Sequence, residues 1–386
     1  MIKKHFMIFM CIAALTVSCQ KEGGDAGDGG VPIERIILST NTLTMPVGYT
    51  ETLTASVMPV EATGTVLVWS SSNPECAVVS DAGTVTSIGL GTCTITVGVE
   101  GSSIKSTCGV TVTDNYIDEY GIDQGPGIQI GTVVWAPVNC GYHETDYPYG
   151  KFYQWGRSCG FGYSGDEHYS PWDASGYDKV EGPLSYGETP DPDVFYTGVF
   201  DVNHGQWMDL DENGDWAFDG VTRWDELRSL EQFEDNEGIG DPCPRGWRVP
   251  TFDELRSLKC GSASLQEGST YVASGPGGQA GRFFGENHAY ATASDPMGCI
   301  FLSFAGEVTP DTGVTQNRGR YGHYWASTPD PDEVVAMTGP TGIFGTMASA
   351  IYISQYSSNG VLEIGYQRAY GISVRCVKDT PDINDK

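Results

Sequence analysis

Side chains that carry oxygen atoms alternate along one short run of this 386-residue sequence. The run contains the four residues Asp209, Asp211, Asn213 and Asp215. Because Gly214 stands where a calcium-binding loop turns sharply, the pattern predicts a site for Ca²⁺, an ion that prefers oxygen ligands. The twelfth position is Gly220 instead of a bidentate glutamate, so another carboxylate such as Asp219 would have to close the site. The alternative interpretation is an ordinary turn rich in Asp and Asn.

Aromatic side chains are concentrated in the second part of the chain, where eight of the nine tryptophans lie beyond residue 127. Tryptophan and tyrosine rings stack on the apolar faces of sugars, and they also fill irregular cores. The candidates for a sugar site are Tyr169, Trp172, Trp207 and Trp216. Two of them flank the predicted calcium loop, so an ion bound there would also order an aromatic platform. The alternative for each ring is a structural role in the core.

Eleven cysteines are present, and two of them lie in the apolar N-terminal segment. Nine remain, so at least one thiol stays free or pairs with another molecule if disulfides form. A hairpin that turns at residues 100–102 would bring Cys93 and Cys108 opposite each other, within reach of a disulfide. Cys76 would then be left over. The alternative is that these three cysteines are small buried thiols.

No set of residues with a catalytic spacing stands out. The histidines show neither the His-x-x-His nor the His-Glu-x-x-His spacing of a zinc site, and the sequence contains no Gly-x-Ser-x-Gly elbow and no phosphate-binding loop. We therefore predict a protein that is not an enzyme. The formal net charge of −29 repels nucleic acids and anionic lipid surfaces, so nucleic acid is not an expected partner.

The N-terminal segment predicts export and attachment to a membrane. Lys3 and Lys4 precede an apolar run of about a dozen residues, shorter than the roughly 20 that a transmembrane helix needs. The sequence Thr16-Val17-Ser18-Cys19 resembles a bacterial lipobox, which implies acylation of Cys19. We expect residues 1–19 to be a lipoprotein signal peptide and residues 20–30 a flexible tether, with the chain anchored in the outer membrane and exposed at the cell surface. The alternative is a soluble secreted protein.

Residues 31–114 consist of short runs that alternate apolar and polar side chains between turn residues, which is typical of a β-sandwich. The motifs Val68-Trp69-Ser70-Ser71-Ser72-Asn73-Pro74 and Gly91-Thr92-Cys93-Thr94-Ile95-Thr96 resemble the group 2 bacterial immunoglobulin-like (Ig-like) domain. In that family the domain is usually a spacer or an adhesive stalk. The resemblance therefore implies a stalk at the start of the mature chain.

Residues 115–127 are rich in Asp and Gly and predict a linker, after which the composition changes. Residues 128–380 predict an α+β domain with few helices, and residues 381–386 a tail. The regular elements expected in this domain are helices over residues 222–230 and 250–258 and a strand over residues 369–377. The second helix begins with a capping box of Thr251 and Glu254. The predicted fold class is therefore a β-rich multidomain protein.

Several phrases of this second unit resemble the major paralogous domain first catalogued in Fibrobacter (FISUMP). In order along the chain, they are residues 134–140, 149–157, 241–251, 324–327 and 373–377. That family is similar to a variant of the C-type lectin fold, also seen in formylglycine-generating enzymes, so the resemblance implies a lectin-like head. Those enzymes need a close cysteine pair near the C-terminus, where this sequence has only Cys376.

Cysteine order and the FISUMP resemblance together favour one set of disulfides among the fifteen possible pairings of the six later cysteines. The favoured pairs are Cys243 with Cys376, Cys140 with Cys159, and Cys260 with Cys299. Structural bridges are favoured over redox roles for all of them.

The leading functional prediction is a surface lipoprotein that presents a lectin-like binding head on an Ig-like stalk, for adhesion or for glycan binding. Its ligand would be a glycan or a surface protein. The head lacks the Glu-Pro-Asn and Gln-Pro-Asp triplets of calcium-dependent sugar sites, so stacking on aromatic rings would carry the binding. The alternative is a non-catalytic structural or assembly component of a surface fimbria, and a third hypothesis is an enzyme of unknown chemistry.

Overall fold

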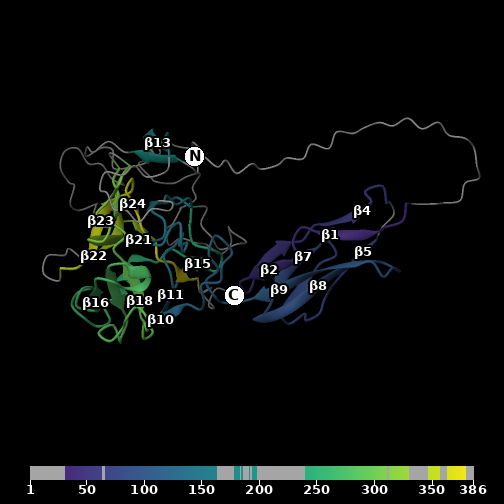
Figure 1. Cartoon of the computed structure of the whole chain (residues 1–386), viewed down its shortest axis with the longest axis horizontal. Coiled ribbons are helices and arrows are strands. Elements are labelled where there is room, and N and C mark those ends of the chain that lie inside the picture. Colours follow the sequence, from purple (N-terminus) through teal and green to yellow (C-terminus); the bar gives the residue numbers. More distant parts are fainter. Residues whose placement is uncertain are drawn as a thin grey trace, which may run out of the picture.

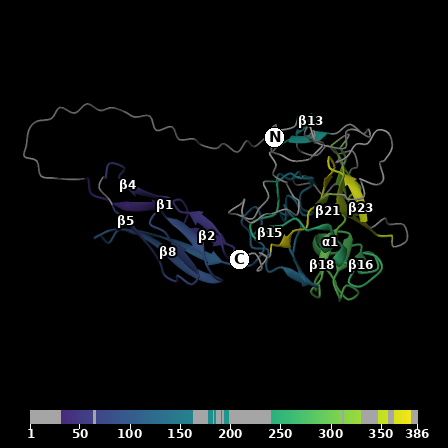
Figure 2. The same ribbon diagram turned by 180° about the vertical axis from the view of Figure 1, so that it is seen from behind.

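The computed structural model describes residues 31–62, 66–162, 178–182, 184–185, 191, 194–197, 240–310, 313–329, 347–356 and 363–379. In these residues the chain forms many short strands, one α-helix and one 3₁₀-helix, so the prediction of a β-rich protein is confirmed. Figures 1 and 2 show strands β1 to β9 grouped apart from the later strands. The helices among the described residues are too short and too polar to cross a membrane.

Nine strands build the first group, here called the Ig-like domain. Their bounds are β1 Arg35–Leu38, β2 Thr42–Met45, β3 Thr50–Thr52, β4 Ala55–Met58, β5 Leu67–Ser71, β6 Ala77–Val79, β7 Thr84–Ser87, β8 Gly91–Val99 and β9 Lys105–Val112. They form sheets of order β2-β9-β8-β5 and β3-β7-β6 and a β1-β4 pair. All neighbours are antiparallel except β2 and β9, which run parallel.

Strand β8 shows why this domain folds as a sandwich. Its side chains alternate between buried and exposed, with Cys93, Ile95 and Val97 turned inward, as expected for a sheet with one face on a core. Cys93 and Ile95 pack with Val85 of the second sheet and with Leu53, which follows β3. Trp69 packs against the same core and stays partly exposed.

Gly83 is required where β7 begins. Its φ of +83° is unfavourable for residues with a side chain. A Cβ atom there would also lie 2.4 Å from the backbone oxygen of Leu53 and 2.9 Å from the ring of Trp69. Glycine at this position therefore allows the second sheet to approach the tryptophan.

The second group of strands, here called the head, contains two four-stranded sheets, two three-stranded sheets and one pair of strands among the described residues. One sheet has the order β10 (Ile128–Ile130), β11 (Val133–Trp135), β25 (Val377–Lys378), β15 (Trp247–Arg248); the next has the order β12 (Tyr153–Gln154), β24 (Gly371–Ile372), β19 (Glu307–Val308), β20 (Thr315–Gln316). Three-stranded sheets follow, with β16 (Ser269–Val272), β17 (Gly281–Phe284), β18 (Ile300–Ser303) and with β21 (Tyr321–Pro329), β22 (Met347–Ser354), β23 (Glu363–Gln367). A parallel pair, β13 (Asp178–Glu181) and β14 (Val194–Thr197), and a 3₁₀-helix over Pro276–Gly278 complete it.

Large aromatic side chains fill the core of the head. Trp135, Trp155, Trp247 and Trp325 are all at most 2% exposed. The indole nitrogen of Trp155 donates to the carbonyl of Ala326, and that of Trp325 donates to the carbonyl of Tyr153. Because buried indole N–H groups need partners, these bonds cross-link distant segments. The four tryptophans are therefore structural, as the alternative reading of the aromatic residues proposed.

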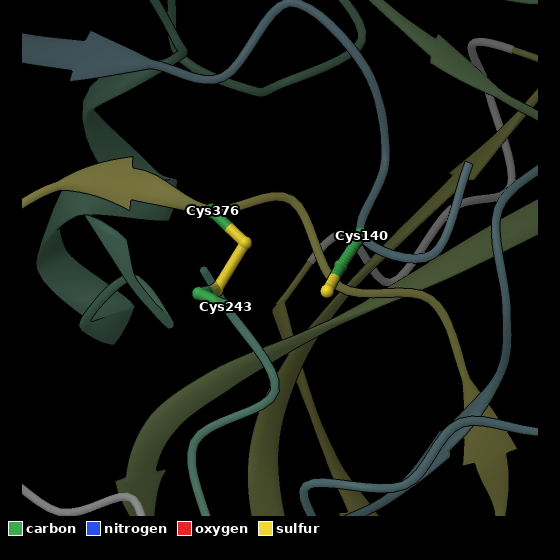
Figure 3. A group of neighbouring side chains, drawn as sticks. All are labelled: Cys140, Cys243 and Cys376. Carbon is green, nitrogen blue, oxygen red and sulfur yellow. A yellow bond between two sulfur atoms is a disulfide. The ribbon is translucent and has the colours of Figure 1, made fainter. Parts of the chain in front are cut away.

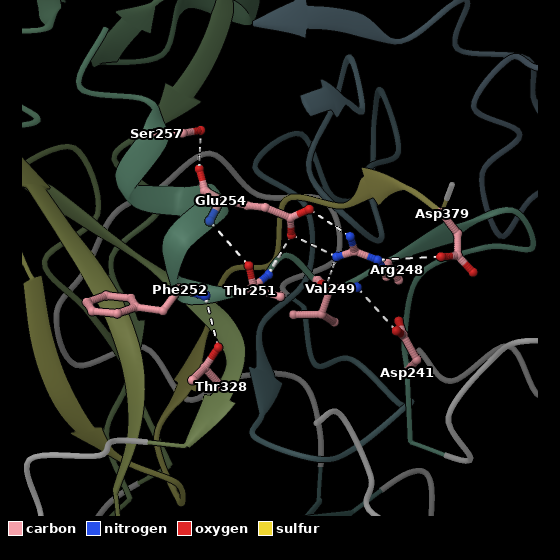
Figure 4. A network of polar contacts seen from close by, with 9 residues as sticks. All are labelled: Asp241, Arg248, Val249, Thr251, Phe252, Glu254, Ser257, Thr328 and Asp379. Carbon is pink, nitrogen blue, oxygen red and sulfur yellow. Dashed lines mark hydrogen bonds and ion pairs between the residues drawn. The ribbon is translucent and has the colours of Figure 1, made fainter. Parts of the chain in front are cut away.

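Helix α1 (Phe252–Ser257) begins as its sequence predicts. The Thr251 hydroxyl accepts from the backbone N–H of Glu254, and the Glu254 carboxylate accepts from the backbone N–H of Thr251. The same carboxylate binds the guanidinium of Arg248 through two hydrogen bonds of 2.8 and 2.6 Å (Figure 4). Residues 222–230, where the other helix is predicted, lie outside the described part of the chain.

Two expectations about local structure differ from what is found. The strand predicted over residues 369–377 is split into β24 and β25, because the segment between them pairs with other parts of the chain: Ser373 with His323, and Val374 with Cys140. The predicted linker also contributes to the head, since Tyr116 is 1% exposed and packs edge-on against Trp247. Residues 115–127 are mostly polar, so their composition does not predict that Tyr116 is buried in the head.

Polar contacts join the Ig-like domain to the head. The backbone N–H of Gly246 donates to the Tyr49 hydroxyl over 2.9 Å, and the neighbouring Arg245 contacts Glu51 at 3.2 Å. An ion pair of 3.0 Å links Lys378 in β25 to Asp114. The loop before β15 and the strand β25 thus both contact the Ig-like part of the chain.

Candidate binding site

An aromatic cluster covers one face of the β21-β22-β23 sheet. His323 lies directly opposite Tyr352 in the antiparallel register of β21 and β22. Tyr321 is two residues before His323 and therefore points to the same face. Tyr366, from β23, stacks on the imidazole of His323 with ring centroids 4.6 Å apart. Three neighbouring strands therefore bring these four rings together.

The rings of this cluster contact one another in a continuous chain. Tyr321 lies 5.3 Å from Tyr352 and 5.4 Å from His323, measured between centroids. His323 is 5.1 Å from Tyr352, and Tyr366 is 4.4 Å from Tyr370. Tilted and edge-on pairs at these separations are favourable beyond the area that they bury. The imidazole is fully enclosed, whereas the four tyrosines stay partly exposed.

Glu307 in β19 places a carboxylate under these rings. It accepts a hydrogen bond from the Tyr366 hydroxyl, another of 3.4 Å from the Tyr321 hydroxyl, and a third of 3.2 Å from the Asn317 amide. Burial raises the pKa of Glu307 above its usual value, and these three donors partly offset that effect. The carboxylate fixes the positions of two tyrosine hydroxyls.

Gly306 allows this carboxylate to approach the sheet. Its N–H donates to the carbonyl of Tyr321 over 2.9 Å, which joins the segment before β19 to the start of β21. A side chain at this position would collide with the carbonyl of Gln316, since a Cβ atom would lie 2.0 Å from that oxygen. The φ of +82° also favours glycine.

His323 is held in its neutral form. It is 4% exposed, and burial lowers its pKa to about 3. Its Nδ1 atom is 3.5 Å from a Glu307 oxygen, but the geometry gives no hydrogen bond to any described residue. At neutral pH the imidazole therefore acts as an aromatic platform for Tyr366 and Tyr352 and carries no charge.

The arrangement has the chemistry of a polyol-binding surface. Partly exposed tyrosine rings offer apolar faces for stacking, and their hydroxyls donate and accept hydrogen bonds. The carboxylate and the imidazole below them are buried, so their role is to position the rings. The contacts available to a ligand are therefore those of Tyr321, Tyr352, Tyr366 and Tyr370.

The sugar-binding, calcium-binding and acylation residues predicted from the sequence all lie outside the described residues. They are Tyr169, Trp172, Trp207 and Trp216, the calcium-loop residues Asp209, Asp211, Asn213 and Asp215, and the lipobox residue Cys19. The calcium site and the acylation site thus remain predictions. The Glu307 cluster was missed because its members come from four strands and form no local motif. Only the alternation of aromatic residues around Tyr324-Trp325 hinted at it.

The cysteines of the Ig-like domain are free thiols, which corrects the predicted Cys93–Cys108 disulfide. The hairpin turns near residues 100–102 as expected, but its register places Cys93 opposite Val110 and Cys108 opposite Ile95. The offset of two residues separates the two thiols. Cys76 lies closer to Cys93, which contributes to the raised pKa of Cys76 after the larger effect of burial.

The later cysteines form one of the three pairs that were expected. Cys243 and Cys376 are joined by a disulfide. The predicted Cys140–Cys159 bond is absent, because the Cys140 thiol points to the carbonyl of Pro242 in the core while Cys159 is partly exposed. Cys260 and Cys299 are also free thiols. They are near enough to interact electrostatically, but each thiol contacts the backbone of the segment between residues 285 and 287.

Comparison with known proteins identifies the first domain. Residues 32–110 match the family of group 2 bacterial Ig-like domains, so this part of the resemblance is confirmed. An uncharacterized protein of Clostridium acetobutylicum is 35% identical over 83 residues, which are 21% of this chain and 21% of that protein. A second uncharacterized protein of the same organism is 40% identical over 79 residues, 20% of this chain and 8% of that protein. The chain thus spans a small part of the curated relatives that it matches.

Solved structures match over a similar share of the chain. A crystal structure of domains 4 and 5 of the S-layer protein SbsC covers 21% of this chain and 53% of its own, with 19% identity and a TM-score of 0.20. A GH10 xylanase from termite gut that contains a bacterial Ig-like domain covers 20% of this chain and 19% of its own, with 24% identity and a TM-score of 0.17. The family match alone identifies residues 32–110 of this chain as a group 2 bacterial Ig-like domain.

Proposed function

We propose that this chain is a lipid-anchored cell-surface protein whose Ig-like domain presents the head for adhesion through a carbohydrate ligand. A group 2 bacterial Ig-like domain fits a structural or adhesive role at a cell surface. The observation that carries the carbohydrate proposal is the row of partly exposed tyrosines above Glu307. We propose no catalytic step, and an outer-membrane anchor at Cys19 is part of the same proposal.

The geometry favours a neutral sugar over a charged ligand. Each of the exposed groups in the cluster is a tyrosine, and the one carboxylate is buried beneath them. Sugars combine apolar faces with hydroxyl groups, which suits rings whose hydroxyls are already oriented by hydrogen bonds to Glu307. Preorganised side chains lose less conformational freedom on binding.

The test is a glycan array with the full chain, purified under oxidising conditions, with Ca²⁺ and with a chelator. We expect saturable binding to at least one glycan. Tyr352→Ala should weaken it about tenfold, which corresponds to ~1.4 kcal/mol of lost stacking. The matched control is Tyr290→Ala, because Tyr290 is 76% exposed and lies outside the cluster. Loss of glycan binding with the chelator would show that binding depends on Ca²⁺, and would support a role for the predicted calcium loop.

Two results would contradict the proposal. Absence of binding to any glycan in both conditions would exclude a carbohydrate ligand of the array. Equal binding by wild type and Tyr352→Ala would move the site away from the tyrosine cluster.

A structural or assembly role is the second candidate, and a specific observation favours it. Tyr49, Glu51 and Asp114 contact the head, so the Ig-like domain is joined to it by more than the connecting chain. Such contacts between domains suit a component that is built into a larger surface assembly. Co-purification of other surface proteins with the full chain, combined with absence of glycan binding, would support this role.

A further inference from the structure

Three cysteines meet in the core of the head, although two of them account for the disulfide. The sulfur atoms of Cys140, Cys243 and Cys376 all lie within 4.8 Å of one another (Figure 3). Each residue is at most 4% exposed. Cys140 keeps a free thiol, which donates to the carbonyl of Pro242, the residue before Cys243. The free thiol is thus held directly beside one end of the bridge.

Backbone and side-chain contacts fix this arrangement. The backbone N–H of Cys140 donates to the carbonyl of Val374, and the carbonyl of Cys376 accepts from Ala136. The buried guanidinium of Arg375 donates to the side-chain oxygen of Asn139 and to the carbonyl of Ala136. These bonds hold the segment before Cys140 against the segment that carries Cys376. The position of the third sulfur is therefore specified by the fold.

We propose that these three cysteines form a thiol–disulfide exchange site, in which Cys140 replaces Cys376 as the partner of Cys243. The thiolate of Cys140 attacks the sulfur of Cys243, the bond between Cys243 and Cys376 breaks, and Cys376 leaves as a thiolate. The proton lost by Cys140 is taken up by Cys376, and the Tyr116 hydroxyl contacts both sulfurs. The number of thiols and disulfides is unchanged, so the step needs no oxidant or reductant.

The sulfur atoms are already close enough to react, but burial of the Cys140 thiol slows the exchange. Burial of the Cys140 thiol raises its pKa to about 12, although hydrogen bonds from Tyr153 and Tyr116 act in the opposite direction. Because the thiolate is the attacking species, exchange in the folded chain is slow near neutral pH and accelerates as pH rises. The chain lengths closed by the two alternative bridges are similar, so loop-closure entropy favours neither strongly.

Exchange changes which segments are covalently joined. The existing bridge connects the loop before β15 to the C-terminal strand β25. Both segments contact the Ig-like domain, through Gly246 and through Lys378. A Cys140–Cys243 bridge would release β25 from this covalent link and leave the loop tied to the core. The exchange site is therefore placed to alter the attachment of the head to the stalk.

The first test is disulfide mapping of the full chain with Cys376→Ser. Oxidised glutathione is supplied as the disulfide oxidant, which takes two electrons and two protons to become two glutathione thiols. Free thiols are then alkylated in acid, and peptides are identified by mass spectrometry. We expect a Cys140–Cys243 peptide. Cys299→Ser is the matched control, since it removes a buried thiol from another cluster and should keep the Cys243–Cys376 bond. Alkylated Cys140 in the Cys376→Ser variant would overturn the proposal.

The second test uses the wild-type chain and does not depend on a variant that folds. The chain is incubated at pH 7, 8 and 9 without added thiol, quenched in acid and mapped over time. The Cys140–Cys243 peptide should appear at a rate that rises about tenfold for each pH unit, as the thiolate fraction does below its pKa. If Cys140 is alkylated and unbridged at every time and pH, the sulfurs are neighbours that do not exchange, and the proposal is wrong.

Discussion

Burial, and not charge pairing, has the largest effect on the protonation of Glu307 and His323 in the tyrosine cluster. Desolvation raises the pKa of Glu307 and lowers that of His323. Both shifts favour the neutral form of the group, so a 3.5 Å approach between a carboxylate and an imidazole does not become a salt bridge at neutral pH. The pair acts on its surroundings by holding Tyr366 in place. His323 supports one face of that ring, and Glu307 accepts a hydrogen bond from the Tyr366 hydroxyl.

His323 should make the folded head sensitive to acid. Its pKa in the folded chain is about 3 against an ordinary 6.5, so the unfolded chain binds a proton that the folded chain excludes. The stability from neutral burial is complete above pH 6.5 and is lost as pH falls toward 3. We expect the free energy of unfolding to drop by at least ~2 kcal/mol between pH 7 and pH 4 on account of this residue. Denaturant unfolding, followed by tryptophan fluorescence, measures it.

The variant His323→Gln isolates this effect. It should lower stability at pH 7, because a packed ring is lost, but it should show a flatter pH dependence between pH 4 and pH 7. Glu307, whose raised pKa makes the folded head less stable as pH rises, remains in both proteins and cancels in the comparison. His288→Gln, at a half-buried histidine elsewhere in the head, is the control and should keep the wild-type slope. A slope in His323→Gln equal to that of wild type would contradict the prediction.

Local rules explain which elements could be predicted from the sequence. Helix α1 follows from a capping box, whose partners are three residues apart, and the hairpin of β8 and β9 follows from alternation and a turn. The register of that hairpin could not be predicted, because a shift of two residues keeps Cys93 and Cys108 on the inner face. The Glu307 site depends on pairing between β21, β22 and β23 and on a bridge to β19, none of which leaves a local signal. Its residues therefore become a site only after folding.

Glu254 is the residue of α1 that should matter most for stability. Burial alone would raise its pKa, but the hydrogen bonds and charge of Arg248 outweigh burial and lower it. Glu254→Gln removes this charge and weakens the cap at Thr251, so we expect a loss of about 2 kcal/mol in the free energy of unfolding at pH 7. The loss should shrink as pH falls through the lowered pKa, where wild type also becomes protonated. Chemical denaturation at pH 7 and pH 3 tests both parts.

Asp253→Asn is the matched control on the same turn. The Asp253 side chain is 92% exposed and its carboxylate lies 3.7 Å from the guanidinium of Arg256, whose side chain is 47% exposed. Surface pairs of this kind contribute ~0.5 kcal/mol or less, so the control should remain within that range of wild type. If Glu254→Gln and Asp253→Asn lower the free energy of unfolding equally, the cap and the Arg248 contact do not explain the loss in Glu254→Gln.

At the scale of the whole molecule, a few polar contacts join the head to the Ig-like domain, and a disulfide connects two of the head segments that make them. Gly246 contacts Tyr49, and the C-terminal strand returns to the same region, where the backbone N–H of Asp379 donates to the carbonyl of Gly246. The bridge between Cys243 and Cys376 stabilises both segments. Contacts between domains that are this polar ordinarily permit relative motion. The disulfide lies within the head, so the link between the two domains consists of the polar contacts and the connecting chain.

The double variant Tyr49→Phe/Glu51→Gln should loosen the junction without unfolding either part. It removes the acceptor for Gly246 and the partner of Arg245, a half-exposed pair that is screened by salt. We expect less than ~1 kcal/mol of change in stability, but a broader distribution of shapes, seen as a changed radius of gyration in small-angle scattering. Glu100→Gln makes the same change of charge in the exposed turn between β8 and β9 and should leave the scattering unchanged.

Identical curves for the double variant and wild type would show that other contacts fix the orientation. A change that 0.5 M salt reproduces in wild type would assign it to the Arg245–Glu51 and Lys378–Asp114 ion pairs, because at that ionic strength exposed charges interact only at close range.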